Sequence, residues 1–157
     1  MTAAEKYVYW RILSDYDFET AECLIAGRRW PYVAFVCHQA VERLLKGMHV
    51  YHTKKETPKT HNLNYIFNRI IKDGSFLAGL KDRQAFENEK ADNIEFMADL
   101  MYYYMSDYPF SYNKVMERFI DEEKAMEIYH RTSELLKWLK QFQTDRDYQR
   151  VGEGIIK

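Results

Sequence analysis

Apolar residues recur every three or four positions along most of this 157-residue chain, which is the spacing of amphipathic helices. The clearest stripe follows Pro31, a residue suited to the first turn of a helix. One face of that segment carries Val33, Val36, Cys37, Ala40, Val41, Leu44 and Met48. The flanks of the stripe are polar, with Gln39, Arg43 and Lys46 on one side and His38, Glu42 and His49 on the other. We therefore expect Gln39, Glu42 and Lys46 at polar edges of this helix, outside the centre of the core.

The same periodicity predicts five helices and no strand. They cover about 4–26, 31–51, 63–73, 84–105 and 121–142, with 76–82 as a linker or a short helical turn. Because short connections join neighbouring helices, we expect an all-α fold, an up-and-down bundle of four long helices plus one shorter helix. We assign residues 1–143 to this bundle and residues 144–157 to a tail that is mobile or bound to a partner.

The charged side chains nearly balance, with 23 basic and 24 acidic residues and a formal net charge of -1. Binding of nucleic acid would therefore need a local basic patch, because the whole chain provides no positive field. Charged residues interrupt every apolar run near the N-terminus, so we expect no signal peptide, no membrane span and a cytoplasmic protein. Cys23 and Cys37 lack the spacing of a zinc or redox site, and we expect both thiols to be reduced and buried.

Short motifs in four places resemble those of a known helical family. The segment after Pro31 reads QAVERLLK over residues 39–46, the loop that follows reads PKTHNL over 58–63, and Tyr108 and Pro109 lie between two predicted helices. The fourth place is the end of the first helix, with Ala21, Glu22, Leu24, Ile25 and Gly27. In their order and spacing these motifs resemble the HEPN domain (higher eukaryote and prokaryote nucleotide-binding domain) of the small stand-alone prokaryotic type, over residues 5–140.

Many HEPN proteins are RNases, and the resemblance implies where their catalytic pair would lie. The family motif Arg-x4-6-His lies near the start of the last long helix, but residues 101–114 contain neither arginine nor histidine, and Asp107 stands beside the Tyr-Pro element. An arginine and a histidine suit such chemistry, for phosphate charge and for proton transfer. Arg43 and His49 have the spacing, but a helix places them about 120° apart. We therefore expect a binding module with no catalytic residue, and keep a metal-independent RNase toxin using Arg43 and His49 as the alternative.

Two further groups of polar residues are candidate ligand sites. Near one end of the first three helices the sequence places five side chains that could bind a nucleotide, RNA or another anion, namely Arg28, Arg29, Lys46, Lys59 and His61. The alternative is a solvated basic rim in which His61 helps to cap the third helix. His38 and Glu42 could share a metal ion, but His49 lies about 16 Å away along the helix. We expect an ordinary contact between His38 and Glu42, and no metal or other cofactor.

Aromatic residues exceed what one small core can bury, since the chain has 13 tyrosines, nine phenylalanines and three tryptophans. Three adjacent tyrosines on a helix point in three directions, so at least one lies outside the core. We expect a homodimer whose interface includes Tyr102, Tyr103, Tyr104 and Tyr108. HEPN domains commonly dimerise and pair with small nucleotidyltransferases, so the resemblance implies such a partner, in a toxin–antitoxin or defence-type module.

Overall fold

The computed structural model describes residues 1–104, 120–143 and 148–149. Regular structure in these ranges is helical throughout, and they contain no strand. The helices are α1 (Ala3–Ala26), α2 (Trp30–Thr53), α3 (Leu63–Ile71), α4 (Gly74–Ala78), α5 (Arg83–Tyr104) and α7 (Glu122–Lys140). None of these described helices is long and apolar enough to span a membrane. The all-α fold predicted from the periodicity is confirmed.

The helix ends follow from local hydrogen bonds of short polar side chains. Thr2 and Glu5 form a capping box at the start of α1. Asn62 caps α3, because its side chain accepts a hydrogen bond of 2.9 Å from a backbone N–H three residues on. Asp73 caps α4 by accepting from two backbone N–H groups. This last cap explains why a short helix forms where the sequence analysis placed the end of a helix and a linker.

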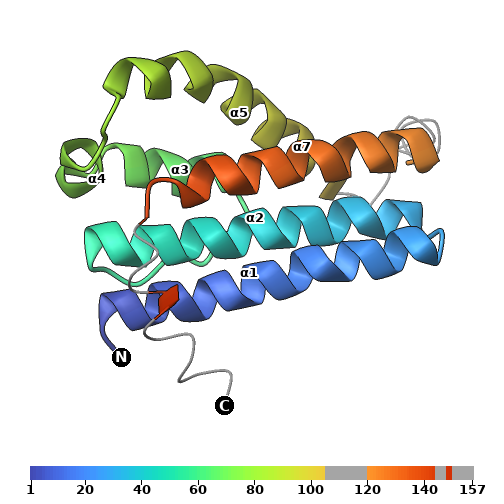
Figure 1. Cartoon of the computed structure of the whole chain (residues 1–157), viewed down its shortest axis with the longest axis horizontal. Coiled ribbons are helices and arrows are strands. Elements are labelled where there is room, and N and C mark those ends of the chain that lie inside the picture. The colour runs from blue at the N-terminus through green and yellow to red at the C-terminus, as the bar shows by residue number, and fades with distance from the viewer. Residues whose placement is uncertain (105–119, 144–147, 150–157) are drawn as a thin grey trace.

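The long helices α1, α2 and α7 lie side by side, and α3 packs against α2 (Figure 1). Gly47 permits the close approach of α1 to α2, since a Cβ atom at this position would lie 2.8 Å from the Cβ atom of Trp10. Helix α5 runs obliquely to the others (Figure 1), and Phe86 near its start packs against Phe76 of α4 and Trp138 of α7. Within the described ranges, the four long helices of the prediction are present with two short ones, but the oblique α5 departs from a regular up-and-down bundle.

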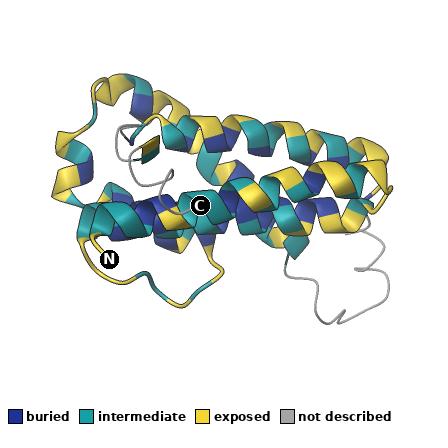
Figure 2. Ribbon diagram, turned by 60° about the horizontal axis from the view of Figure 1, so that its bottom comes forward, coloured by how far each residue is buried: buried dark blue, intermediate teal, exposed yellow. Residues whose placement is uncertain are grey.

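The core surrounds α2, which contacts α1, α3, α5 and α7. Buried positions run through the middle of the molecule and exposed ones cover its outside (Figure 2). The expectation of a polar edge holds for Gln39 and Lys46, which are partly exposed, but it is wrong for Glu42, which is 3% exposed. His38 and His49 on the same flank are fully buried. The burial of these three residues results from tertiary packing, because neighbouring segments cover the flank of α2 that carries them.

The two cysteines are free thiols, but only one of them is buried. Cys37 lies in the core, where burial raises the pKa of its thiol to about 12 and keeps it protonated. Cys23 is exposed on α1, contrary to the expectation of two buried thiols. Helix α1 has other helices on one side only, so the presence of Cys23 in a helix did not suffice to predict that it is buried.

The predicted tail, residues 144–157, lies mostly outside the described residues. Tyr148 is described, and its ring lies 4.0 Å from the guanidinium carbon of Arg11 on α1. The Tyr148 hydroxyl also donates a hydrogen bond of 3.4 Å to Asp15. At this residue, therefore, the segment contacts its own chain.

Candidate functional site

A buried carboxylate on α2 is the centre of the most connected polar group in the described residues. The Glu42 side chain is 4% exposed and accepts a hydrogen bond of 2.6 Å from Lys46 Nζ. His61 Nδ1 lies 3.0 and 3.1 Å from the two carboxylate oxygens. His38 Nδ1 lies 3.6 Å from the nearer oxygen. We call these four residues, His38, Glu42, Lys46 and His61, the Glu42 cluster.

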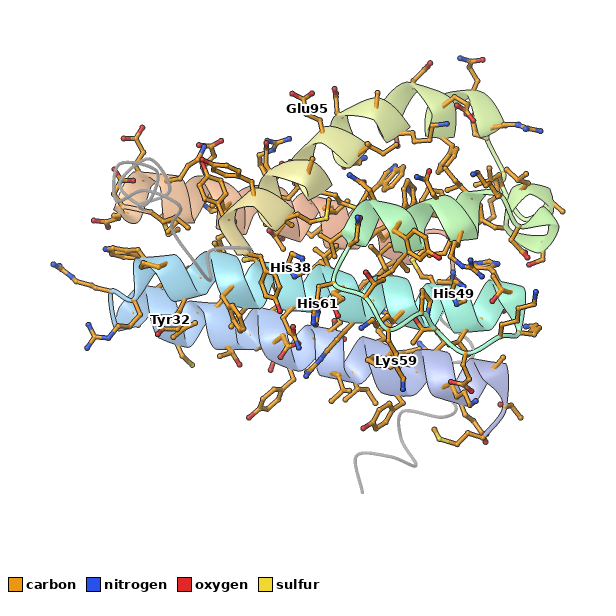
Figure 3. All side chains as sticks on the ribbon, turned by 180° about the vertical axis from the view of Figure 1, so that it is seen from behind. Tyr32, His38, His49, Lys59, His61 and Glu95 are labelled. Carbon is orange, nitrogen blue, oxygen red and sulfur yellow. The ribbon has the colours of Figure 1, made fainter. Side chains whose placement is uncertain are left out.

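The sequence builds this cluster from two motifs. His38, Glu42 and Lys46 are spaced four residues apart, which places them in one row along α2. The loop after α2 then runs back along the helix. To bring His61 beside His38, the loop must span the length of helix between Thr53 and His38, which is 15 residues or about 22 Å. Pro58 favours the extended backbone that this distance requires. Figure 3 shows His61 beside His38, with Lys59 farther along the loop toward His49.

His38 connects the loop and α5 to the buried face of α2. Its Nε2 donates a hydrogen bond of 3.1 Å to the backbone carbonyl of His61, so the Nδ1 atom is unprotonated in the neutral ring. The ring of Tyr104 stacks on the His38 ring, with centroids 3.9 Å apart and planes inclined by 7°. Burial lowers the pKa of His38 to about 4, against the opposing influence of Glu42. His38 is therefore uncharged at neutral pH.

The arrangement suits a structural junction better than a catalytic centre. Lys46 neutralises the Glu42 charge, so the cluster offers no spare positive charge to an anion. Among the described residues, no group of three histidine, cysteine or acidic side chains could hold a metal ion. The contact predicted between His38 and Glu42 is present, but it is buried. What the geometry accomplishes is to fix the 54–62 loop and the end of α5 onto α2.

The basic residues expected to gather at one end of the helices do not all meet. Lys46 and His61 converge on Glu42. Arg28 and Arg29 instead form the connection between α1 and α2. Arg29 and Lys46 are 17 residues apart, or about 25 Å along α2. In Figure 3, Tyr32 near the start of α2 lies far from Lys59 and His49. The prediction that these residues gather at one end was wrong. Helices α1 and α2 are long, so residues at their junction are remote from the loop after α2.

The Arg43 and His49 pair of the RNase alternative does not converge on one site. Arg43 Nη1 lies 2.9 Å from a carboxylate oxygen of Asp17 on α1. His49 is fully buried on another side of α2, where its Nε2 lies 3.4 Å from Nε of Arg69. Each residue thus has a partner of its own. Residues 105–114 of the expected catalytic region, including Asp107 and Pro109, lie outside the described residues.

The three adjacent tyrosines at the end of α5 point in different directions, as expected. Tyr102 is 43% exposed, Tyr103 lies below the Lys124 ammonium at 5.7 Å, and Tyr104 packs between His38 and Phe35. The fourth residue of the predicted interface, Tyr108, lies outside the described residues. Tyr32 and Phe35, which are 62% and 45% exposed, were not among the residues predicted from the sequence. Their spacing of three residues at the start of α2, off its apolar stripe, was the signal that could have found them.

Comparison with known proteins agrees with the resemblance that the sequence motifs indicated. Residues 7–142 match the family model of the HEPN domain. Neither a curated protein nor a solved structure gives a significant match to the chain. The match extends from the second turn of α1 to just beyond α7, and it includes all four residues of the Glu42 cluster. This chain therefore belongs to the HEPN domain family.

Proposed function

We propose that this HEPN domain is a protein-binding module that acts as a homodimer and does not cleave RNA. The observation that carries the proposal is a group of aromatic rings on α2 and α5, which we call the aromatic face: the exposed Tyr32 and Phe35, and the partly buried Tyr104. Phe35 and Tyr104 stack with centroids 5.1 Å apart, and Tyr104 in turn stacks on the buried His38. The exposed Phe35 ring is therefore supported from beneath by two stacked rings.

An aromatic surface of this kind has the physical properties of a protein interface. Tyrosine and phenylalanine provide large contact areas and are enriched in such interfaces, whereas charged residues are depleted. Rings held by stacking lose little conformational entropy when a partner binds. Tyr102, 43% exposed near the same end of α5, points in another direction and provides a further exposed ring. In a twofold dimer the same surface meets its own copy, so one aromatic face supplies both halves of the contact.

Membership of the HEPN family supports the rest of the proposal. In this proposal, the dimer functions in the cytoplasm together with a small nucleotidyltransferase, in a toxin–antitoxin or defence-type module. In this proposal Lys46 and His61 have a structural role and do not bind a nucleotide, because both already contact the Glu42 carboxylate. Arg28, Arg29 and Lys59 remain exposed and can contribute to a polar rim around a partner.

Dimerisation can be measured by light scattering at micromolar concentration. We expect a dimer for the wild type, and a dissociation constant raised by about 30-fold or more by Phe35→Glu, since a central aromatic residue contributes about 2 kcal/mol. Tyr16→Glu is the matched control, because Tyr16 is 69% exposed on α1 and lies outside the aromatic face. A wild type that is only monomeric, or equal dissociation by both substitutions, would contradict the proposal.

RNA cleavage is expected to be absent when single-stranded RNA is incubated with the purified protein. The reason is that residues 101–114 lack both arginine and histidine, and that Arg43 and His49 are held apart. The measurement compares the wild type with His49→Ala from identical preparations, with circular dichroism to establish that both are folded. Cleavage by the wild type that disappears in folded His49→Ala would overturn the non-enzymatic proposal and place a site at α2.

A further inference from the structure

A second polar site lies at the opposite end of α2 from the aromatic face. It is an open pocket of about 290 Å³, lined by Thr53, Lys55, Arg69, Lys72 and Asp73. Thr53 ends α2, Lys55 lies in the 54–62 loop, and Arg69, Lys72 and Asp73 come from the end of α3 and the two residues after it. Tyr32 and Thr53 are 21 residues apart, or about 30 Å along α2, so the pocket is separate from the aromatic face.

The pocket has an excess of positive charge that the described residues leave uncompensated. Lys55 and Lys72 form no ion pair with any described residue, and both are exposed. The single acidic residue of the lining, Asp73, is engaged in capping α4 through backbone N–H groups at 2.9 and 3.4 Å. Glu56 in the adjoining loop pairs with Lys6 of α1. This is therefore a local basic patch on a chain whose overall charge is close to zero.

Arg69 is held in place from beneath. Its Nε donates a hydrogen bond of 3.4 Å to Nε2 of the fully buried His49. Its Nη1 lies 3.5 Å from the hydroxyl of Tyr65 on the same helix. Burial and the Arg69 charge lower the pKa of His49, so its ring is neutral and can accept this hydrogen bond at neutral pH. The remaining N–H donors of the guanidinium, which has five in all, are thus presented in a defined orientation.

We propose that this pocket binds the phosphate group of a small, multiply charged molecule, with Arg69 as the oriented donor and Lys55 and Lys72 as flanking charges. A phosphate monoester carries a charge of about -1.5 to -2 at neutral pH, which matches three cations and one carboxylate. The guanidinium fork can bind two phosphate oxygens at once, and ammonium groups act as point charges. The pocket, of about 290 Å³ and open to solvent, is large enough to hold such a phosphate group.

Titration calorimetry of the full chain with inorganic pyrophosphate at low ionic strength tests this site. We expect one binding event per chain, weakened by about tenfold or more in Arg69→Gln and in Lys72→Gln, because each loses a charge-assisted contact. The matched controls are Arg83→Gln and Lys137→Gln, which remove the same charges from exposed positions outside the pocket. We expect both controls to bind as the wild type does. Circular dichroism establishes that each variant is folded.

Three results would overturn the proposal. The first is no binding by the wild type, and the second is equal weakening by pocket and control substitutions, which would indicate a diffuse charge effect. The third comes from a parallel titration with single-stranded RNA. If RNA binds more tightly than pyrophosphate and only the pocket variants weaken it, the site serves a nucleic acid and not a small molecule.

His49→Gln, which retains an acceptor for Arg69, should preserve pyrophosphate binding, whereas His49→Leu should weaken it through loss of that support.

Discussion

Replacing Glu42 with leucine is expected to lower the free energy of unfolding by about 3 kcal/mol, because Lys46 then loses its counter-charge in a mostly buried position. The Lys46 side chain is 13% exposed, so water replaces only part of the lost interaction. His61 also loses the acceptor that holds its loop against α2. The measurement is urea denaturation followed by circular dichroism, with the wild type in the same buffer.

Two further variants separate the buried ion pair from a general loss of charge. Glu127→Gln removes a carboxylate that is 51% exposed and pairs with Lys124 at the surface, so it should cost no more than about 1 kcal/mol. The double substitution Glu42→Leu with Lys46→Met should recover much of the loss, since an apolar pair no longer strands a charge. A Glu42→Leu protein as stable as the wild type would show that the cluster contributes nothing to stability.

The helix positions could be predicted from the sequence because they depend on local signals. The apolar stripe after Pro31 agrees with the structure, and it acts within a few residues, as does the cap that Asn62 provides. The burial of Glu42 could not be predicted in this way. Its flank of α2 looks solvent-facing on an isolated helix, and it is covered only because residues far along the chain return to it.

The candidate site was predictable in part. The motifs drew attention to Glu42, Lys46 and His61 separately, but the sequence did not show that the last two would converge on the first. That outcome depends on the direction of the loop around Pro58, which a single sequence leaves open. The basic pocket at Arg69 was missed for a similar reason, since Lys55 and Lys72 are 17 residues apart and belong to different elements.

Acidification is expected to destabilise the fold through His38. Burial lowers the pKa of the folded-state imidazole to about 4, while the ordinary value is 6.5. Between these two values the unfolded chain binds a proton at His38 that the folded chain does not, so stability is full above about pH 6.5 and falls as the pH decreases toward 4. The difference between the two pKa values corresponds to on the order of 3 kcal/mol.

The groups that face His38 decide how this result is tested. Glu42 and Lys46 lie on its own helix, and His61 faces it from the loop. His38→Gln removes the titration but retains a side-chain donor for the His61 carbonyl. Urea denaturation at pH 7 and pH 4.5 should show that the loss of stability on acidification is smaller in His38→Gln than in the wild type by roughly 2 kcal/mol. His130→Gln is the control, because His130 is exposed on α7 and its replacement should leave the pH dependence unchanged. Identical pH dependence in wild type and His38→Gln would mean that His38 takes up its proton equally in both states, and that its burial does not govern the acid sensitivity of the fold.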